Sequence, residues 1–234
     1  MLSTRPNNFL LINKPAGWTS FDAVNYIRNK ARSESGNKSI KVGHAGTLDP
    51  FATGLLIVGV GREATKRLDE FKNLPKTYVA TLKLGEVSDT GDPTGKIKNY
   101  ELRIKNYELD NSQIENVLKQ FIGKQLQTPP MFSAKKINGQ RLYKLARQGK
   151  TVERQPDEIE ILNIKILKYS WPLLKIEVTC SAGTYIRTLA SDIGEKLGVG
   201  AYCKELTRTK IGDYKLEDAE ELKDVTVVRG GQIC

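Results

Sequence analysis

Short apolar runs and helix-like stretches follow one another in mixed order along this chain, and this order constrains its fold more than any other feature. Residues 76–84 and 173–180 alternate apolar and polar side chains, which is typical of strands with one buried face. About eight strands and five helices in mixed order predict an α/β or α+β sheet protein. Further apolar runs predict strands over 9–13, 55–60, 159–168 and 201–212.

Helices are predicted where apolar residues recur at helical spacing behind a capping residue. Thr19 or Ser20 caps a helix over 21–32. Ser112 and Glu115 form a capping box that opens another helix, which ends before Gly123. The same spacing predicts helices over 61–72, 184–197 and 216–223.

Glycines, a proline and small residues surround two polar side chains, His44 and Asp49, in the segment 41–54. Glycine permits left-handed turns and close approach of the backbone to a ligand, and a residue before proline is driven toward an extended backbone. Asp49, which precedes Pro50, is therefore expected on a tightly held loop at the edge of the strand 55–60. Such a position is common for a reactive carboxylate. The alternative is that Asp49 caps a turn, and the spacing alone favours this alternative.

The charge balance favours a polyanionic partner. The 234 residues contain 37 Lys and Arg against 27 Asp and Glu, which gives a net charge of +10. Nucleic acid is the simplest such partner, although a lysine-rich proteome also produces basic proteins. Between 127 and 152, Lys135, Lys136 and Arg147 are interleaved with aromatic residues, which suits phosphate contacts and base stacking. An exposed basic helix with a buried apolar edge would show the same pattern.

Several classes of protein are excluded by what the sequence lacks. His44 is the only histidine and the three cysteines lie far apart, so a multi-histidine metal site, a zinc site and a disulfide framework are not expected. The loop 85–95 lacks the acidic ligands of a calcium-binding loop. No apolar run approaches the roughly 20 residues of a membrane span. The N-terminus has no signal-peptide core, so we expect a cytoplasmic protein.

The segment Gly43–Pro50, continued by residues 52–54, resembles the signature loop of the TruB family of pseudouridine synthases. The resemblance extends in order over residues 9–218 and implies a pseudouridine synthase fold. That fold is α+β, with a central mixed, mostly antiparallel sheet flanked by helices and loops and an RNA-gripping thumb inserted over about 127–152. The other matching segments are the pattern from Lys14 to Ser20, the strand that carries Tyr78, residues 133–147, and Gly183–Arg187 followed by Asp192 and Gly194.

The resemblance implies a role for particular residues. Asp49 is the catalytic carboxylate, Arg187 pairs with it, and Tyr78 stacks on the uracil and accepts a proton. His44 helps to extrude the base from its stack or fills the vacated place. The implied reaction imports no group and oxidises nothing, so neither a metal nor a cofactor is expected. The resemblance further implies Lys66 and Tyr185 beside the catalytic residues, Leu206 against the uracil, and Lys14, Lys135, Lys136 and Arg147 at phosphates.

The implied substrate is the T-loop uridine of tRNA, conventionally position 55, and we expect the enzyme to be a monomer. We expect one catalytic domain over 1–224 and a short tail over 225–234. That tail is too short to form the PUA-type RNA-binding domain that many family members carry at the C-terminus.

Two other functions fit the same motifs. One is a non-catalytic protein that binds or folds tRNA on the same scaffold, although such a protein has no use for a carboxylate that faces phosphates. The other is a pseudouridine synthase that depends on a guide RNA. A glycosidase requires two carboxylates that flank the scissile bond, and Asp49 is the one with a motif around it.

Overall fold

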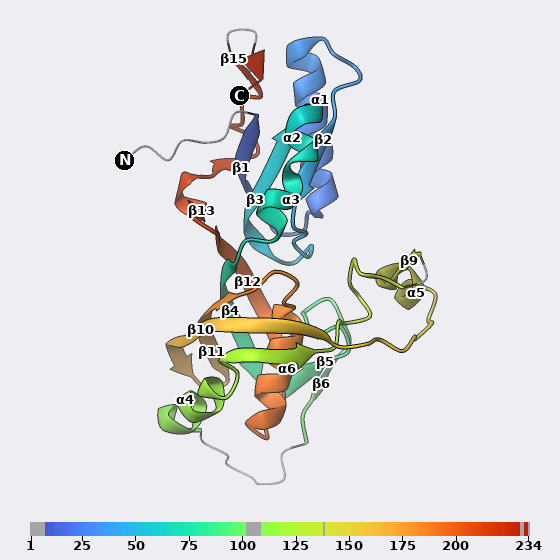
Figure 1. The fold of residues 1–234 in the computed structure, drawn as a ribbon. Coiled ribbons are helices and arrows are strands. Elements are labelled where there is room, and N and C mark those ends of the chain that lie inside the picture. The colour runs from blue at the N-terminus through green and yellow to red at the C-terminus, as the bar shows by residue number, and fades with distance from the viewer. Residues whose placement is uncertain (1–7, 102–108, 138, 230–231, 234) are drawn as a thin grey trace. The chain divides into compact units, whose positions relative to one another are not determined.

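The computed structural model describes residues 8–101, 109–137, 139–229 and 232–233 (Figure 1). These residues form two compact units. The first unit comprises residues 1–77 and 207–234, and the second comprises residues 78–206. Among the described residues, no helix is long and apolar enough to cross a membrane.

The first unit is built on strand β3 (Thr53–Val60), which pairs with a strand on each side. β1 (Phe9–Lys14) and β2 (Val42–Ala45) are antiparallel to β3. Parallel pairs join β3 to the end of β12 (Ala201–Ile211) and β1 to the short strand β14 (Glu220–Glu221). The remaining elements of this unit are β13 (Tyr214–Lys215), β15 (Val228–Arg229), β16 (Gln232–Ile233), α1 (Ser20–Ser35), α2 (Arg62–Lys66), α3 (Leu68–Lys72) and the 3-10 turn Leu216–Asp218.

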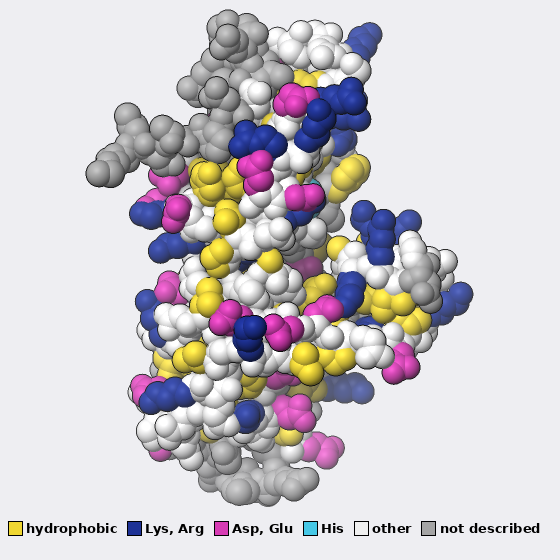
Figure 2. All heavy atoms as spheres, in the orientation of Figure 1, with side chains coloured by type: hydrophobic (Ala, Val, Ile, Leu, Met, Phe, Trp, Pro, Cys, Tyr) yellow, Lys and Arg dark blue, Asp and Glu magenta, His cyan; other side chains and the backbone are white. Residues whose placement is uncertain are grey.

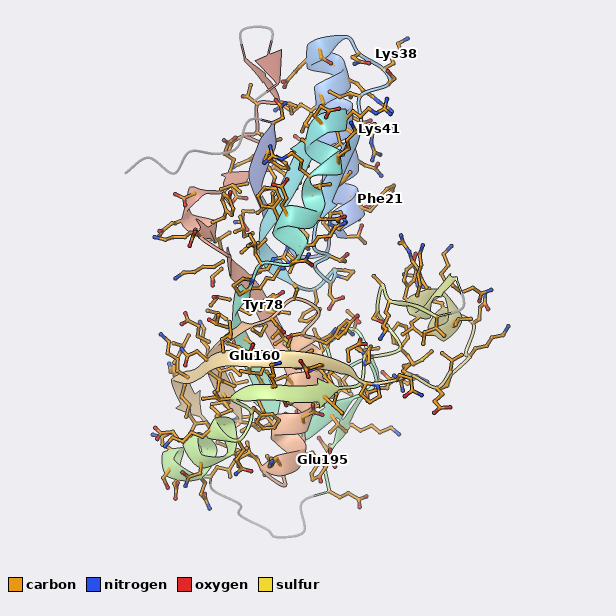
Figure 3. The ribbon with its side chains drawn as sticks, in the orientation of Figure 1. Phe21, Lys38, Lys41, Tyr78, Glu160 and Glu195 are labelled. Atoms are coloured by element: carbon orange, nitrogen blue, oxygen red, sulfur yellow. The ribbon has the colours of Figure 1, made fainter. Side chains whose placement is uncertain are left out.

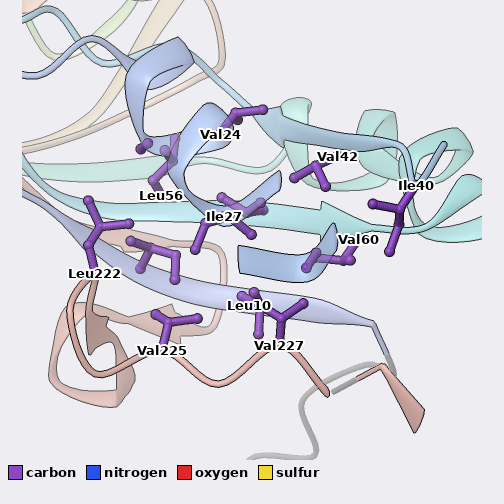
Figure 4. Packing of buried hydrophobic residues seen from close by; sticks show 14 residues of the cluster. Leu10, Val24, Ile27, Ile40, Val42, Leu56, Val60, Leu222, Val225 and Val227 are labelled. Atoms are coloured by element: carbon purple, nitrogen blue, oxygen red, sulfur yellow. The ribbon is translucent and has the colours of Figure 1, made fainter. Parts of the chain in front are cut away.

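The apolar run in β3 is continuous because both faces of this strand are buried. Leu56, Val58 and Val60 pack against α1 in one cluster (Figure 4). Leu55 and Ile57 point the other way and pack with residues of α2 and α3. The expected strand over 55–60 is therefore confirmed, and its burial explains why it lacks an apolar–polar alternation.

The predicted tail contributes to this core. Val225 and Val227 are fully buried and belong to the cluster that packs against α1 (Figure 4). The backbone N–H of Val227 donates to Oε2 of Glu34 at 2.9 Å, which ties this segment to the end of α1.

The second unit contains a sheet in the order β12-β4-β11-β10-β7. The antiparallel pairs β7–β10 and β10–β11 form one end of this sheet. β10 carries two register shifts, at Leu162 and Leu167. The strands and helices are β4 (Lys76–Leu84), β5 (Glu86–Ser88), β6 (Ile97–Asn99), α4 (Asn111–Lys119), β7 (Gly123–Gln127), β8 (Lys136–Ile137), β9 (Gln140–Arg141), α5 (Leu142–Arg147), β10 (Asp157–Ser170), β11 (Leu173–Cys180) and α6 (Ile186–Lys196).

The expected fold class is confirmed, since helices flank a mixed, mostly antiparallel sheet. Several predicted elements are also confirmed with close bounds. β4 and β11 span the residues where apolar and polar side chains alternate in the sequence. Thr19 caps α1 in a capping box, because it accepts from the N–H of Asp22 while the Asp22 carboxylate accepts from the N–H of Thr19.

One predicted helix cap is wrong, and one predicted helix is confirmed as two shorter helices. α4 is capped by Asp110, whose carboxylate accepts from the N–H of Gln113 at 2.7 Å, so the predicted box of Ser112 and Glu115 does not form. Ser112 instead donates its hydroxyl proton to Asp110. The predicted helix over 61–72 breaks at Arg67, whose N–H bonds to the carbonyl of Ala64 in a tighter turn.

Two further predictions fail because strand pairing outweighs weak local preferences. The helix expected over 216–223 is reduced to a 3-10 turn at Leu216–Asp218, since Glu220 and Glu221 pair with β1. The loop expected over 85–95 begins with β5, which forms a hairpin with β6.

Gly54 of β3 lies against the backbone of Arg208 in β12, so a substitution of Gly54 tests whether this close packing stabilises the fold. Its φ is +104°, and a Cβ atom there would collide with the carbonyl oxygen of Arg208. We expect Gly54→Ala to lower the free energy of unfolding by about 2 kcal/mol more than Gly17→Ala does, as overpacking usually costs. Gly17 is the matched control, because its φ is +81° and a Cβ there meets nothing within 4 Å. Urea unfolding checks this prediction, and equal losses for the two variants would contradict it.

Candidate active site

Asp49 lies in the first unit, on the irregular segment between β2 and β3. Its loop is fastened to the N-terminus of α1. The buried hydroxyl of Ser20 accepts from the N–H of Leu48 at 2.8 Å and donates to the carbonyl of Leu48 at 3.2 Å. The N–H of Gly17 donates to the carbonyl of Pro50 at 2.8 Å. The expectation that Asp49 lies outside a helix on a tightly held loop is confirmed.

A buried arginine from β12 closes this loop at both ends. The Arg208 side chain is 1% exposed. Its Nε donates to the carbonyl of Leu55 at 2.8 Å and its Nη2 donates to the carbonyl of Gly46 at 3.1 Å. Sequence reasoning missed Arg208, although an arginine at an inward position of a predicted strand is a signal that could have identified it.

Lys14 is a buried residue of the first unit. Its side chain is fully buried at the end of β1, and its Nζ donates to the carbonyls of Pro15 at 2.8 Å and Trp18 at 2.6 Å. The predicted phosphate contact of Lys14 stays a prediction, and in the structure its ammonium is bonded to backbone carbonyls. Burial lowers the pKa of Lys14 to about 8, with the nearby charge of Asp49 acting to raise it and that of Arg208 to lower it. Lys14 thus places a buried amine beneath the loop that carries Asp49.

His44 and Lys66 also belong to the first unit. His44 lies in β2 opposite Val58 and is partly buried. Lys66 ends α2, and its exposed ammonium pairs with Glu63 of the same helix at 2.8 Å. Their predicted roles near the substrate stay predictions.

Arg187 lies in the second unit, in the first turn of α6, where the helix dipole disfavours a cation. A buried ion pair compensates for this position. The guanidinium Nη1 lies 3.2 Å from Oδ2 of Asp92, and both side chains are almost completely buried. Arg187 also donates to the carbonyl of Thr90 at 2.8 Å and to that of Phe132 at 2.7 Å. The predicted pairing of Arg187 with Asp49 joins residues of different units and stays a prediction.

Asp92 is a functional candidate that sequence reasoning missed, because the residues around it are typical of a simple turn. Its second carboxylate oxygen, Oδ1, accepts from the hydroxyl of Thr90 and from the N–H of Thr94, each at 2.9 Å. The loop between β5 and β6 therefore holds the carboxylate in one orientation. Gly91 lies against Arg187, and a Cβ atom there would be 3.3 Å from the arginine Cβ.

The other predicted residues of the second unit lie on separate elements. Tyr78 is a buried residue near the start of β4, and Leu206 is a buried residue of β12. Tyr185 precedes α6, where its N–H donates to Oε1 of Gln127 at 2.8 Å and its carbonyl accepts from Nε2 at 3.1 Å. The Gln127 side chain thus fixes the backbone at the start of α6.

The basic segment over 127–152 folds as the hairpin β8–β9 followed by α5. Lys136 and Arg147 are exposed there, and the Arg147 guanidinium lies 5.7 Å from the centre of the Tyr143 ring. Lys135 is engaged with Asp157, since its Nζ lies 2.6 Å from Oδ1 and 2.5 Å from Oδ2. Lys136 and Arg147 are therefore better placed than Lys135 to meet a phosphate. An open pocket of about 660 Å³ in this segment is lined by Lys136, Gly139, Gln140, Arg141, Tyr143, Lys144, Gln148 and Lys150.

Comparison with protein families gives two matches. Residues 32–186 match the model described as TruB family pseudouridylate synthase (N terminal domain). Residues 187–229 match the model described as tRNA pseudouridylate synthase B C-terminal domain.

Curated relatives cover almost the whole chain. A tRNA pseudouridine synthase B of Parabacteroides distasonis is 47% identical over 218 residues, which cover 92% of this chain and 91% of that protein. A protein of the same name from Phocaeicola vulgatus is 44% identical over 217 residues, which cover 93% of this chain and 91% of that protein.

Solved structures of similar fold include longer chains. A Cbf5–Nop10–Gar1 complex contains a chain with a TM-score of 0.69 and 29% identity, matched over 92% of this chain and 52% of that one. An H/ACA RNP bound to a substrate RNA containing 2′-deoxyuridine gives a TM-score of 0.66 and 27% identity, over 92% and 51%. This chain spans about half the length of those solved chains.

The two family matches run without a break from residue 32 to residue 229, and they include Asp49, Tyr78, Asp92 and Arg187. The relatives extend the similarity over nine-tenths of the chain at well above 30% identity. On these grounds the chain belongs to the TruB family of pseudouridylate synthases.

Proposed function

We propose that this protein isomerises the T-loop uridine of tRNA at position 55 to pseudouridine, with Asp49 as the catalytic carboxylate. The observation that carries the proposal is the loop of Asp49, which is fastened by Ser20, Gly17 and Arg208 in a chain of the TruB family. The curated relatives are named tRNA pseudouridine synthase B, which supports tRNA as the substrate.

The reaction breaks the bond between N1 and C1′ of the uridine, turns the detached uracil and joins C5 to C1′. N1 gains a proton and C5 loses one, so the substrate and product have the same composition. A carboxylate near C1′ is required either to form a sugar adduct or to assist elimination. Holding that group rigidly is what a fastened loop contributes, since small misplacements of a reacting group cost large factors in rate.

Arg187 is proposed to pair with Asp49 when RNA is bound. Support comes from the family matches, which include both residues. Three contacts within the second unit orient the guanidinium without the substrate. Tyr78 is proposed to stack on the uracil and to accept a proton, for which its ordinary pKa of about 10 makes it a weak base without help. Leu206 would contact the uracil, and Tyr185 and Lys66 would line the site.

RNA binding is proposed to involve the exposed cations of the segment 127–152, above all Lys136 and Arg147. The target base must leave its stack before the reaction can begin, and His44 is proposed to fill the vacated place. We expect the enzyme to act as a monomer in the cytoplasm and to need neither a metal nor a cofactor.

A guide-RNA-dependent synthase is the second candidate, because structural similarity to chains from Cbf5 and H/ACA complexes favours it. Those chains are nearly twice as long as the part that matches, whereas the proteins of Parabacteroides distasonis and Phocaeicola vulgatus named tRNA pseudouridine synthase B match over 91% of their length. The full-length similarity therefore favours a synthase that acts on tRNA without a guide.

Asp49→Asn is expected to reduce product formation by at least about 10³-fold, because the amide is neither a nucleophile nor a base of comparable strength. Binding of a T-stem-loop transcript should change less than about threefold. Tritium release from C5-labelled uridine measures the first quantity, and filter binding measures the second. Substantial turnover by the variant would remove Asp49 from the catalytic role, and inactivity of the wild type with binding intact would favour the non-catalytic function.

Asp92→Asn is expected to lower the single-turnover rate by about 10²-fold at saturating enzyme, since Arg187 loses the charge that orients it. The matched control is Asp89→Asn, which removes an exposed carboxylate from the same loop. Equal rates for the two variants would contradict a role of the buried pair in catalysis, and circular dichroism checks that both variants fold.

Replacing Lys136 and Arg147 together with Gln is expected to weaken RNA binding and to flatten its salt dependence. Removing a single cation from a phosphate lowers the slope of log K against log salt by about 0.7 to 0.9. Lys119→Gln is the control, because this exposed lysine lies on α4 outside the basic segment. An unchanged slope in the double variant would show that these residues do not contact phosphates.

A further inference from the structure

The start of α1 exposes an aromatic ring next to the loop that carries Asp49. Phe21 is 60% exposed, although phenylalanine is usually buried in folded proteins. Its neighbour Ser20 is buried and hydrogen bonded to both backbone groups of Leu48, the residue before Asp49. Phe21 therefore directly follows the residue that is bonded to the backbone next to the proposed catalytic carboxylate, in the same unit.

The guanidinium of Arg28, which is held by hydrogen bonds, lies over the Phe21 ring. The Arg28 guanidinium lies two helical turns further along α1, 5.8 Å from the centre of the Phe21 ring. Its Nη2 donates to the carbonyl of Val42 at 3.2 Å, and its Nη1 donates to Oδ1 of Asn25. These contacts hold Arg28 against β2, so one side of the aromatic ring has a positive charge beside it while much of its surface remains open to solvent.

Exposed lysines continue from this ring along the same side of the first unit. Figure 3 shows Phe21, Lys41 and Lys38 in succession there. Lys38 lies in the loop after α1 and Lys41 directly precedes β2. In the space-filling view, Lys and Arg side chains gather over α1 and α2 (Figure 2).

Nearby carboxylates are engaged with other groups. Asp22 accepts from the N–H and the hydroxyl of Thr19 in the capping box. Glu34 accepts from the N–H of Val227, and Glu63 pairs with Lys66. The cations Arg28, Lys38 and Lys41 beside the exposed ring of Phe21 make this surface suited to an anionic partner with a flat apolar part.

We infer that Phe21 is a stacking site for an unpaired base of the RNA substrate, other than the uridine that is isomerised. Lys41 and Lys38 bind the phosphates on one side of that base. The inference rests on the proposed function, because it takes the RNA bound at Asp49 to continue along this surface. Phe21 is a positioning residue and has no part in the chemical step.

The chemistry of the surface favours RNA over a protein partner. Protein interfaces bury several apolar residues together and are depleted of lysine at their centres. Here an exposed aromatic ring lies beside several cations, which is the arrangement that binds single-stranded nucleic acid through stacking and phosphate contacts. Such stacking tolerates any base, because each base has a flat face.

Removing the aromatic partner of one stacked base weakens binding by roughly 5- to 150-fold. We therefore expect Phe21→Ala to raise the Kd of a T-stem-loop transcript about tenfold. Phe21→Tyr, which keeps a flat ring, should bind within about twofold of the wild type. The single-turnover rate at saturating enzyme should be unchanged in both variants. Leu126→Ala is the control, because this residue of β7 is 72% exposed and lies in the second unit.

A double-mutant cycle identifies the base. Each unpaired nucleotide of the transcript is made abasic in turn. Binding of each RNA is measured for two proteins, one with Phe21 and one with Phe21→Ala. Both proteins also carry Asp49→Asn, so that the RNA is not modified during the measurement. We expect one position at which the abasic change weakens binding to the Phe21 protein about tenfold and to the alanine variant hardly at all. Lys41→Gln should lower the salt slope by about 0.7.

The outcomes separate this inference from the proposed function. If the wild type modifies the RNA but no abasic position couples to Phe21, the stacking site is refuted while the function stands. An equal loss of binding in Phe21→Ala and Leu126→Ala also refutes it, since the effect is then not specific to the ring. If the wild type neither binds nor modifies the RNA, the proposed function fails and the inference fails with it.

Discussion

The buried guanidinium of Arg208 fastens the two ends of the loop on which Asp49 stands. It bonds to the carbonyl of Gly46 before the aspartate and to that of Leu55 after it, while Ser20 binds the loop at Leu48. A buried charged side chain is costly unless its donors are satisfied, so these bonds hold the arginine as firmly as they hold the loop. Gly54 permits the contact, because a Cβ atom there would collide with the backbone of Arg208. The order of the proposed catalytic loop thus follows from the packing of β3 against β12.

In the second unit, too, a buried arginine is held by hydrogen bonds, and here one of its partners is a carboxylate. Asp92 and Arg187 are both nearly excluded from solvent. The second carboxylate oxygen of Asp92 accepts from a loop hydroxyl and a backbone N–H, and Arg187 donates to two backbone carbonyls. Breaking a buried pair by removing one partner typically costs about 3 to 5 kcal/mol, because the other charge is then left uncompensated. The pair therefore fixes the orientation of the arginine at the start of α6 before any RNA arrives.

Local patterns predicted much of the fold. The alternation in β4 and β11 and the capping box at Thr19 are local signals, and the structure confirms them. The helix expected near Leu216 gave way to pairing of Glu220 and Glu221 with β1, which depends on residues two hundred positions away. Lys14 was expected at phosphates, whereas in the structure its side chain is buried at the end of β1 and its ammonium binds the backbone carbonyls of Pro15 and Trp18. Asp92 was missed because its importance lies in hydroxyls, N–H groups and a guanidinium that the fold brings together. The inward strand position of Arg208 marked it as buried, but the carbonyls that it binds come from distant residues.

The most direct test of the account uses the purified protein and a tRNA transcript with no other component. After reaction, carbodiimide treatment followed by primer extension locates each pseudouridine as a stop. The account predicts one strong stop, in the T loop at position 55, and none when the protein carries Asp49→Asn. Stops at other positions, or modification that appears after a guide RNA is added and not before, would contradict it.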